Sequence, residues 1–247
     1  MHEVRVPIHG PLEAATFVER PNRFIVRCRM EDGAVVAAHL ADPGRLSDLL
    51  APGRRLWLRR SDNPARRTAW SAVLAERPDG KGLVSVDSTL PNRLIAHALR
   101  EQALPELREW APLRAEWRHG ASRFDFVLAA DDGRRLALEV KSVTLVEGDV
   151  AYFPDAVTAR GARHVRELAE IVRQDGWEGA VLFVVQRDDA AEVRPDARVD
   201  PGFAEALALA ADAGVRLLAR RCRVTLDHVA LGPSLPVSVP ALPGIPG

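Results

Sequence analysis

The sequence predicts an α+β chain of two domains, an OB-like β-barrel over residues 1–85 and a mixed-sheet α/β domain over residues 86–235. Short apolar runs separated by turn residues fill the first third, and from Leu90 helical patterns alternate with strand patterns. The balance of charge also changes along the chain. Residues 1–85 carry 14 Lys and Arg against 10 Asp and Glu, and the rest carries 20 against 24.

Composition limits the class of protein. The 247 residues are 47% hydrophobic and 28% charged with zero formal net charge, which is typical of a globular protein. No apolar run approaches the roughly 18 residues of a membrane span, and "MHEVRVPIHG" lacks a signal-peptide pattern, so we expect a cytoplasmic protein without membrane contact. Cys28 and Cys222 form no CxxC pair, which indicates reduced thiols and no zinc site.

The first domain is predicted from a succession of strands around one short helix. The expected strands cover residues 12–20, 23–30, 34–40, 54–60, 67–77 and 82–87. Between them "DPGRLSDLL", residues 42–50, has a proline and leucines at helical spacing and predicts the short helix. This order is that of an OB-type barrel, a small barrel that often binds oligonucleotides.

Arginines and tryptophans concentrate in the barrel segment. Aromatic side chains between arginines suit stacking on bases together with phosphate contacts, although arginines alternating with leucines also describe the outer face of any barrel strand. The candidate nucleic-acid-binding residues are Arg54, Arg55, Trp57, Arg59, Arg60, Arg66 and Arg67.

The second domain is predicted as helices between strands. We expect helices from Leu90, from residue 156 or 158 to about 174, and over 201–214, and a loose Pro/Gly-rich tail over 236–247. The expected strands cover residues 113–118, 122–129, 135–143, 179–187, 215–220 and 223–229. The run "GAVLFVVQR" is nearly all apolar, as in a strand buried on both faces.

Three charges interrupt a predicted hairpin, "FDFVLAADDGRRLALEVKS". If Asp131, Asp132 and Gly133 form a three-residue loop, Asp125 faces Glu139 across the hairpin, whereas a two-residue turn separates them. Opposed carboxylates are unfavourable unless a cation binds between them, so this register predicts a divalent metal completed by water and phosphate. Lys141, one of only two lysines, could then assist phosphodiester cleavage. The alternative is the solvent-facing half of an amphipathic hairpin.

Several longer blocks resemble a known family. In order they are "VDSTLPNRL", "HGASRFDFVL", "LEVKSVTLV", "YFPDAVTARGARHVREL", "VLFVVQR" and "DPGFAEAL". The chain resembles the sugar fermentation stimulation protein A (SfsA) family, with a second domain similar to the PD-(D/E)XK nuclease superfamily. The resemblance implies DNA binding, with Asp125 and Glu139 as metal ligands and Lys141 as the catalytic lysine.

Further residues are candidates for the edge of this site. A third acid could be Glu101 on the helix or Glu116 on the next strand. Asp155 and Arg160 precede or open the long helix, where Asp155 or Thr158 could instead be an N-cap. Gln186 and Arg187 end the buried strand and either face the site or emerge into solvent. The remaining peripheral candidates are Asn92, Arg93, Arg123 and Ser142. His97 and His164 have no partner at metal-ligand spacing and are interpreted as surface or half-buried histidines.

The leading hypothesis is a DNA-binding protein with a nuclease-type site dependent on Mg²⁺ or Mn²⁺. One alternative is a non-catalytic DNA-binding regulator of sugar (maltose) metabolism genes. Another is a hydrolase acting on RNA or on a small phosphorylated molecule. The sequence leaves open whether the DNA is single- or double-stranded, and leaves the oligomeric state open.

Overall fold

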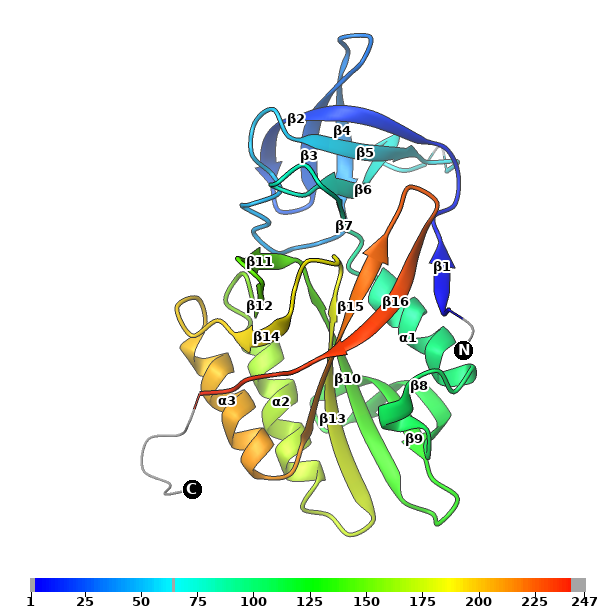
Figure 1. Cartoon of the computed structure of the whole chain (residues 1–247), viewed down its shortest axis with the longest axis vertical. Coiled ribbons are helices and arrows are strands. Elements are labelled where there is room, and N and C mark those ends of the chain that lie inside the picture. Colours follow the sequence, from blue (N-terminus) through cyan, green and yellow to red (C-terminus); the bar gives the residue numbers. More distant parts are fainter. Residues whose placement is uncertain (1–2, 64, 241–247) are drawn as a thin grey trace.

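The computed structural model describes residues 3–63 and 65–240. A small β-barrel lies at the top of Figure 1, above a larger domain in which helices pack on a long twisted sheet. The predicted α+β chain with a barrel followed by a mixed-sheet domain is confirmed. Within the described ranges, no helix is long and apolar enough to cross a membrane.

Six strands build the barrel domain. They are β2 (Leu12–Asn22), β3 (Ile25–Met30), β4 (Val35–Leu40), β5 (Arg55–Arg60), β6 (Trp70–Glu76) and β7 (Leu83–Ser85). The strand order is β4-β3-β2-β5-β6-β7, and a parallel pairing of β4 with β6 closes the ring. Alternation along β5 fits this closure, because Leu56 and Leu58 are buried in the barrel core while Arg55 and Arg60 are exposed.

The helix predicted over residues 42–50 does not form. The segment contains only a turn, in which the backbone N–H of Leu50 donates to the carbonyl of Leu46 at 2.8 Å. Leu46 has φ +51°, and Asp42 accepts from the backbone N–H of Gly44 at 2.8 Å. A left-handed residue and a side-chain turn at its start are incompatible with a regular helix.

The large sheet has seven strands in the order β1-β16-β15-β13-β10-β9-β8. They are β1 (Arg5–Pro7), β8 (Ala111–His119), β9 (Ser122–Ala129), β10 (Arg135–Val143), β13 (Trp177–Val185), β15 (Arg216–Val224) and β16 (His228–Leu235). β10, β13 and β15 run parallel to one another and the remaining pairs are antiparallel, so the sheet is mixed, as predicted.

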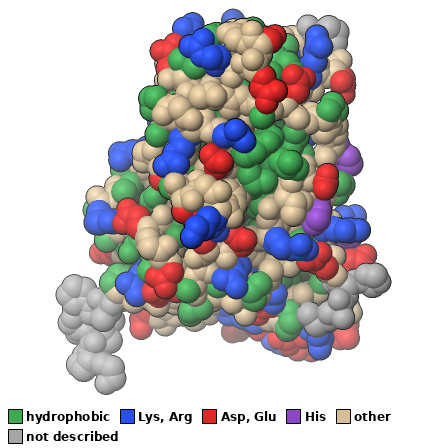
Figure 2. Space-filling model, turned by 45° about the horizontal axis from the view of Figure 1, so that its top comes forward, with side chains coloured by type: hydrophobic (Ala, Val, Ile, Leu, Met, Phe, Trp, Pro, Cys, Tyr) green, Lys and Arg blue, Asp and Glu red, His purple; other side chains and the backbone are tan. Residues whose placement is uncertain are grey.

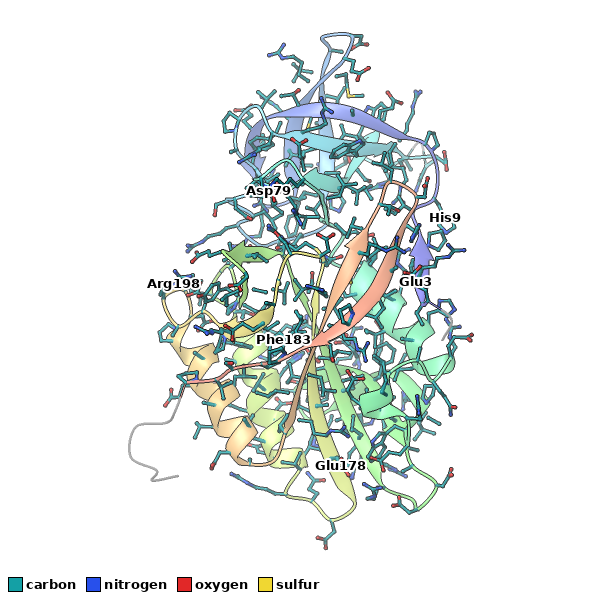
Figure 3. All side chains as sticks on the ribbon, in the orientation of Figure 1. Glu3, His9, Asp79, Glu178, Phe183 and Arg198 are labelled. Carbon is teal, nitrogen blue, oxygen red and sulfur yellow. The ribbon has the colours of Figure 1, made fainter. Side chains whose placement is uncertain are left out.

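Helices cover both faces of this sheet. They are α1 (Leu90–Arg100), the 3₁₀ helix η1 (Pro105–Leu107), α2 (Ala159–Ile171) and α3 (Pro201–Asp212). Along β13, Leu182 packs in the hydrophobic cluster of α1, whereas Phe183, at the centre of the large domain in Figure 3, packs in that of α2 and α3. Burial on both faces explains why "GAVLFVVQR", which contains most of β13, is nearly all apolar. Thr158, one of the two predicted caps, accepts from the N–H of Gly161 at 3.0 Å and begins α2.

The two ends of the chain depart from the predicted segments. β1 pairs with β16, so residues 5–7 lie in the large sheet and not in the barrel. A small sheet of β11 (Leu145–Glu147), β12 (Val150–Phe153) and β14 (Glu192–Pro195) receives the start of the predicted loose tail, because Val193 exchanges backbone hydrogen bonds with Pro236 and Ser238. Residues 241–247 lie outside the described part. The strand predicted over 223–229 is interrupted by a turn between β15 and β16.

Candidate active site

The hairpin of β9 and β10 has the predicted three-residue loop. Gly133 has φ +88°, the left-handed conformation that this loop requires. Phe126 pairs with Leu138, which is the register that brings Asp125 opposite Glu139. Of the two turns that the sequence left open, the structure therefore has the one on which the predicted metal site depends.

Counted from the turn, Phe126 and Leu138 are the last paired residues, so the pairing of β9 with β10 stops just before it reaches Asp125. Phe124 and Phe126 belong to hydrophobic clusters on opposite faces of the sheet, so β9 twists between them. The Asp125 carboxylate occupies the resulting gap. Its Oδ2 accepts from the backbone N–H of Val140 at 2.7 Å and its Oδ1 accepts from Nδ2 of Asn92 at 2.6 Å. Donors from β10 and α1 thus fix its orientation.

Glu139 is held by two nitrogen groups. Its Oε1 lies 2.7 Å from Nζ of Lys141 and 2.7 Å from Nδ1 of His164 on α2. Nε of Arg160 lies 3.3 Å from the other ring nitrogen of His164. A histidine protonated on Nδ1 satisfies both contacts, since it donates to Glu139 and accepts from Arg160. Oε2 of Glu139 is buried and has no hydrogen-bond partner among the described residues.

The two carboxylates have opposite pKa shifts. Burial raises the pKa of Asp125 to about 6, and repulsion from Glu139 acts in the same direction. Burial also disfavours the charged form of Glu139, but attraction to Lys141 and the hydrogen bond with His164 outweigh it, so its pKa is lowered. The two acids are therefore close enough to repel, and nearby cations compensate chiefly Glu139.

These residues fit a divalent cation. The unpartnered Oε2 of Glu139 is an orphaned acceptor in a buried position, and repulsion of Asp125 by Glu139 outweighs its attraction to Lys141. Across the described residues there is no metal-like cluster of three or more His, Cys, Asp or Glu. Two carboxylates suffice for Mg²⁺ when water and substrate phosphate supply the other ligands.

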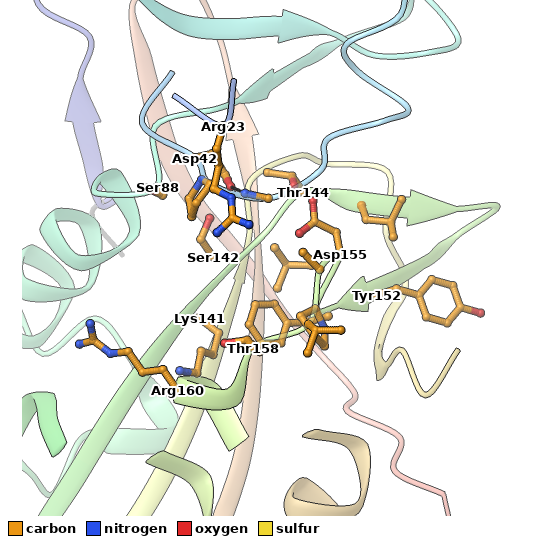
Figure 4. A pocket seen from close by; sticks show the side chains of 18 of the residues that line it. Arg23, Asp42, Ser88, Lys141, Ser142, Thr144, Tyr152, Asp155, Thr158 and Arg160 are labelled. Atoms are coloured by element: carbon orange, nitrogen blue, oxygen red, sulfur yellow. Dashed lines mark hydrogen bonds between the residues drawn. The ribbon is translucent and has the colours of Figure 1, made fainter. Parts of the chain in front are cut away.

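A cavity of about 490 Å³ adjoins the hairpin beneath the barrel (Figure 4). Lys141 and Arg160 lie at its lower end in this view, while Arg23 and Asp42 of the barrel lie at its upper end, with Asp155 beside them. Both domains thus contribute charged side chains to one opening. Of Asp125, Glu139 and Lys141, it is Lys141 that lines the cavity.

Comparison with known proteins identifies the family. Residues 18–86 match the SfsA N-terminal OB domain and residues 89–228 match the sugar fermentation stimulation protein RE domain. The chain belongs to the SfsA family. The sugar fermentation stimulation protein homolog of Shouchella clausii is 44% identical over 230 residues, covering 93% of this chain and 98% of the relative. The homolog of Chloroflexus aurantiacus is 44% identical over 236 residues, covering 95% and 89%.

A solved structure of the same family has the same fold. It is described as Pyrococcus furiosus SfsA in complex with Ca²⁺ and is 27% identical to this chain. The superposition has a TM-score of 0.86 and covers 97% of this chain and 100% of that one. The SfsA resemblance predicted from the sequence blocks is therefore confirmed, as is the OB barrel.

In this SfsA-family chain, three predicted peripheral residues lie at the site. Asn92 donates to Asp125, and Oγ of Ser142 accepts from Nε2 of Gln186 at 2.9 Å. Gln186 is fully buried, so its emergence into solvent, the alternative for the end of this strand, is wrong. Its Nε2 also lies 3.3 Å from the carbonyl of Asp87, between the two domains.

Asp155 and Arg187 connect the barrel to the second domain. Oδ2 of Asp155 accepts from the backbone N–H of Leu46 at 3.0 Å. A Cβ atom at Gly44 would clash with the same oxygen, so glycine permits this close approach. Arg187 is almost fully buried and pairs with Asp48 at 3.2 Å, which again excludes emergence into solvent.

Four other peripheral candidates make contacts away from the two carboxylates. Arg93 pairs with Asp87 at 2.9 Å. Glu101, at the end of α1, and Glu116, on β8, have side chains that are 60% and 69% exposed. Glu116 lies 3.6 Å from Arg123. Neither acid therefore joins the contacts around Asp125 and Glu139.

The predicted barrel patch lies away from the cavity. None of its seven residues is among those that line the opening at Lys141. Arg54 donates to the carbonyl of Pro78 at 2.9 Å and Arg66 to Oγ of Ser71 at 3.1 Å. On the face shown in Figure 2, basic side chains are interspersed with acidic and apolar ones. A nucleic-acid role for this patch stays a prediction.

Sequence reasoning missed His164 as part of the site. It is 2% exposed, so its interpretation as a surface or half-buried histidine is wrong. A signal was present, because His164 precedes Val165 on the apolar stripe of α2, where a polar residue needs a partner. That the partner is Glu139 depends on how α2 packs on the sheet, and local sequence does not encode this.

Proposed function

We propose that this chain binds DNA and hydrolyses its phosphodiester bonds with Mg²⁺ or Mn²⁺ held by Asp125 and Glu139. The observation that carries the proposal is the pair of the half-buried Asp125 and the buried Glu139 beside an open cavity, with one oxygen of Glu139 left without a partner among the described residues. A relative that covers nearly the whole chain is described in complex with Ca²⁺, which supports a divalent cation in this fold.

A cation at this position would activate water and offset charge on the phosphate. The residues of the chain supply the rest. Asn92 and the backbone N–H of Val140 orient Asp125, and His164 orients Glu139. Lys141 places an ammonium group at the cavity, where it can bind a phosphate oxygen as negative charge develops.

A non-catalytic DNA-binding protein is the competing function. Its support is the ion pair of Lys141 with Glu139, which occupies the ammonium group that hydrolysis would need. A hydrolase of RNA or of a small phosphorylated molecule would use the same residues. These functions differ in substrate and turnover, so one assay separates them.

The assay incubates the protein with labelled single-stranded DNA, duplex DNA and RNA, each with Mg²⁺, Mn²⁺ or EDTA. Cleavage of DNA should require the metal and fall about 10²-fold or more in Asp125→Asn, Glu139→Gln and Lys141→Met. Asp132→Asn, in the exposed loop of the same hairpin, is the matched control and should cleave normally. DNA binding without cleavage under any metal would refute the nuclease and support the non-catalytic function. Cleavage of RNA alone would support the second alternative.

A further inference from the structure

A second pocket lies beside the active site, on the α2 side of the hairpin. Its volume is about 340 Å³, and it lies between the β8–β9 turn and the first turns of α2. Four arginines from three elements line it, and we call it the arginine pocket: Arg118, Arg123, Arg160 and Arg163. All four side chains are exposed, so their charges are available at the surface.

The positive charge of the arginine pocket is only partly balanced. Arg118 makes no side-chain hydrogen bond or ion pair with any other described residue. Arg123 lies 3.6 Å from Glu116, and Arg163 lies 3.9 Å from Glu167. Such long contacts of exposed arginines are weak and leave guanidinium N–H groups for another acceptor. Four cations therefore face two anions around one hollow.

A buried hydroxyl group in the pocket also lacks a partner. Ser122, at the start of β9, is 4% exposed and lines the pocket, and its Oγ has no hydrogen-bond partner among the described residues. Buried hydroxyl groups are normally satisfied, and an anion in the pocket would be an acceptor near this donor. Planar guanidinium groups bind the oxygens of a phosphate in pairs. The chemistry of the pocket is thus that of an oxyanion site.

The arginine pocket adjoins the proposed catalytic residues through His164 and Arg160. His164 lines it and contacts Glu139 through its Nδ1. Arg160 lines both this pocket and the cavity that contains Lys141. A strand lying in the cavity with its reacting phosphate near Lys141 can therefore continue past Arg160 into the pocket.

We propose that the arginine pocket binds a backbone phosphate of the DNA strand, next to the phosphate that lies at Lys141. The inference rests on the proposed DNA binding but not on turnover. It also places backbone recognition in the second domain, on β8, β9 and α2, and not on the predicted arginines of β5.

The test measures DNA binding in EDTA, so that cleavage does not enter. Fluorescence anisotropy with a labelled oligonucleotide, single-stranded and as a duplex, gives the dissociation constant across a range of NaCl concentrations. The Arg118→Gln/Arg163→Gln variant should bind about tenfold more weakly, and its log-log salt slope should fall by about 1 to 2. The control Arg166→Gln/Arg173→Gln removes two exposed charges from α2 and its C-terminal end, outside the pocket, and should change both quantities much less.

The outcomes distinguish this inference from the proposed function. If the wild-type chain binds no DNA, the proposed function and the inference fall together. If the wild type binds and the pocket variant keeps its affinity and slope, only the inference is refuted. Titration with inorganic phosphate tests whether the pocket binds a free anion instead of a DNA strand. If the variant loses phosphate binding but keeps its affinity for DNA, a contact with the strand is also refuted. Thermal unfolding of both variants should match the wild type, because the replaced side chains are exposed.

Discussion

Replacing Asp42 with asparagine should stabilise the protein at neutral pH. Asp42 is 8% exposed and lies where the barrel meets the second domain. Burial raises its pKa to about 6, and the charges of Asp155 and Asp87 act in the same direction. The folded state therefore binds this proton more tightly than the unfolded chain, whose aspartate titrates near 3.8. The stabilisation from Asp42 is fully present below that value and is lost as pH rises to about 6.

The size of the effect follows from the two pKa values. The interval from 3.8 to about 6 corresponds to about 3 kcal/mol between the ends of the titration. Between pH 4.5 and 7.5, about 2 kcal/mol of this falls within the measured range. The asparagine side chain would titrate no proton and would retain an Oδ1 acceptor for the N–H of Gly44. The free energy of unfolding of Asp42→Asn minus that of the wild type should thus rise by about 2 kcal/mol over this interval.

Urea unfolding followed by circular dichroism at several pH values measures this difference. Asp32→Asn is the matched control, because Asp32 accepts the same kind of turn hydrogen bond, from Ala34 at 2.9 Å, but is exposed. Its difference from the wild type should stay constant with pH. If the difference for Asp42→Asn also stayed constant with pH, Asp42 would not be buried near Asp155 and Asp87. That result would contradict the arrangement of the domains at this loop.

Three further predictions concern the contacts between the two domains and the proposed metal site. Gly44→Ala should destabilise the wild type by at least about 1 kcal/mol, because the new Cβ clashes with the Asp155 carboxylate. In an Asp155→Ala background the same change should cost under about 0.5 kcal/mol, which a double-mutant cycle by urea unfolding measures. Arg187→Ala should cost about 3 kcal/mol in urea unfolding, against under about 1 for Arg27→Ala, whose ion pair with Glu19 is exposed on both sides; equal costs would contradict a buried ion pair at Arg187. Ca²⁺ should raise the thermal unfolding midpoint of the wild type and not that of Glu139→Gln, and equal shifts would exclude Glu139 as a ligand.

The hairpin shows what local sequence can predict. Turn chemistry reduces its register to two possibilities, a two-residue or a three-residue loop, and counting gives the pairing that each implies. The structure has the three-residue loop, with Gly133 left-handed and Phe126 paired with Leu138. The same reasoning failed at residues 42–50. There leucine spacing indicated a helix, but Leu46 is left-handed and its N–H is bound by Asp155, more than 100 residues away. The contact of Leu46 with Asp155 of the second domain thus decides the conformation of this segment, and leucine spacing does not.

The environment of the acids depended on contacts between distant elements. His164 meets Glu139 only because α2 crosses the face of β10, and Asn92 meets Asp125 only because α1 lies over the opposite face. Neither pairing leaves a periodic signal in the chain. Arginine content shows a different limit: the run on β5 is visible in the sequence, whereas the arginines of the second pocket come from separate segments and meet only in the fold.

The buried charges of β10 are better explained by chemistry than by stability. Glu139 and Lys141 are 5% and 9% exposed, and a buried ion pair is often no more stabilising than apolar residues of similar volume. The adjoining strand β13 fills the same layers with apolar side chains alone, so this sheet does not need charge to pack. Asp125 adds repulsion without a cation of its own. A fold that only had to be stable would gain by losing these groups, whereas a site that binds a cation next to phosphate requires them.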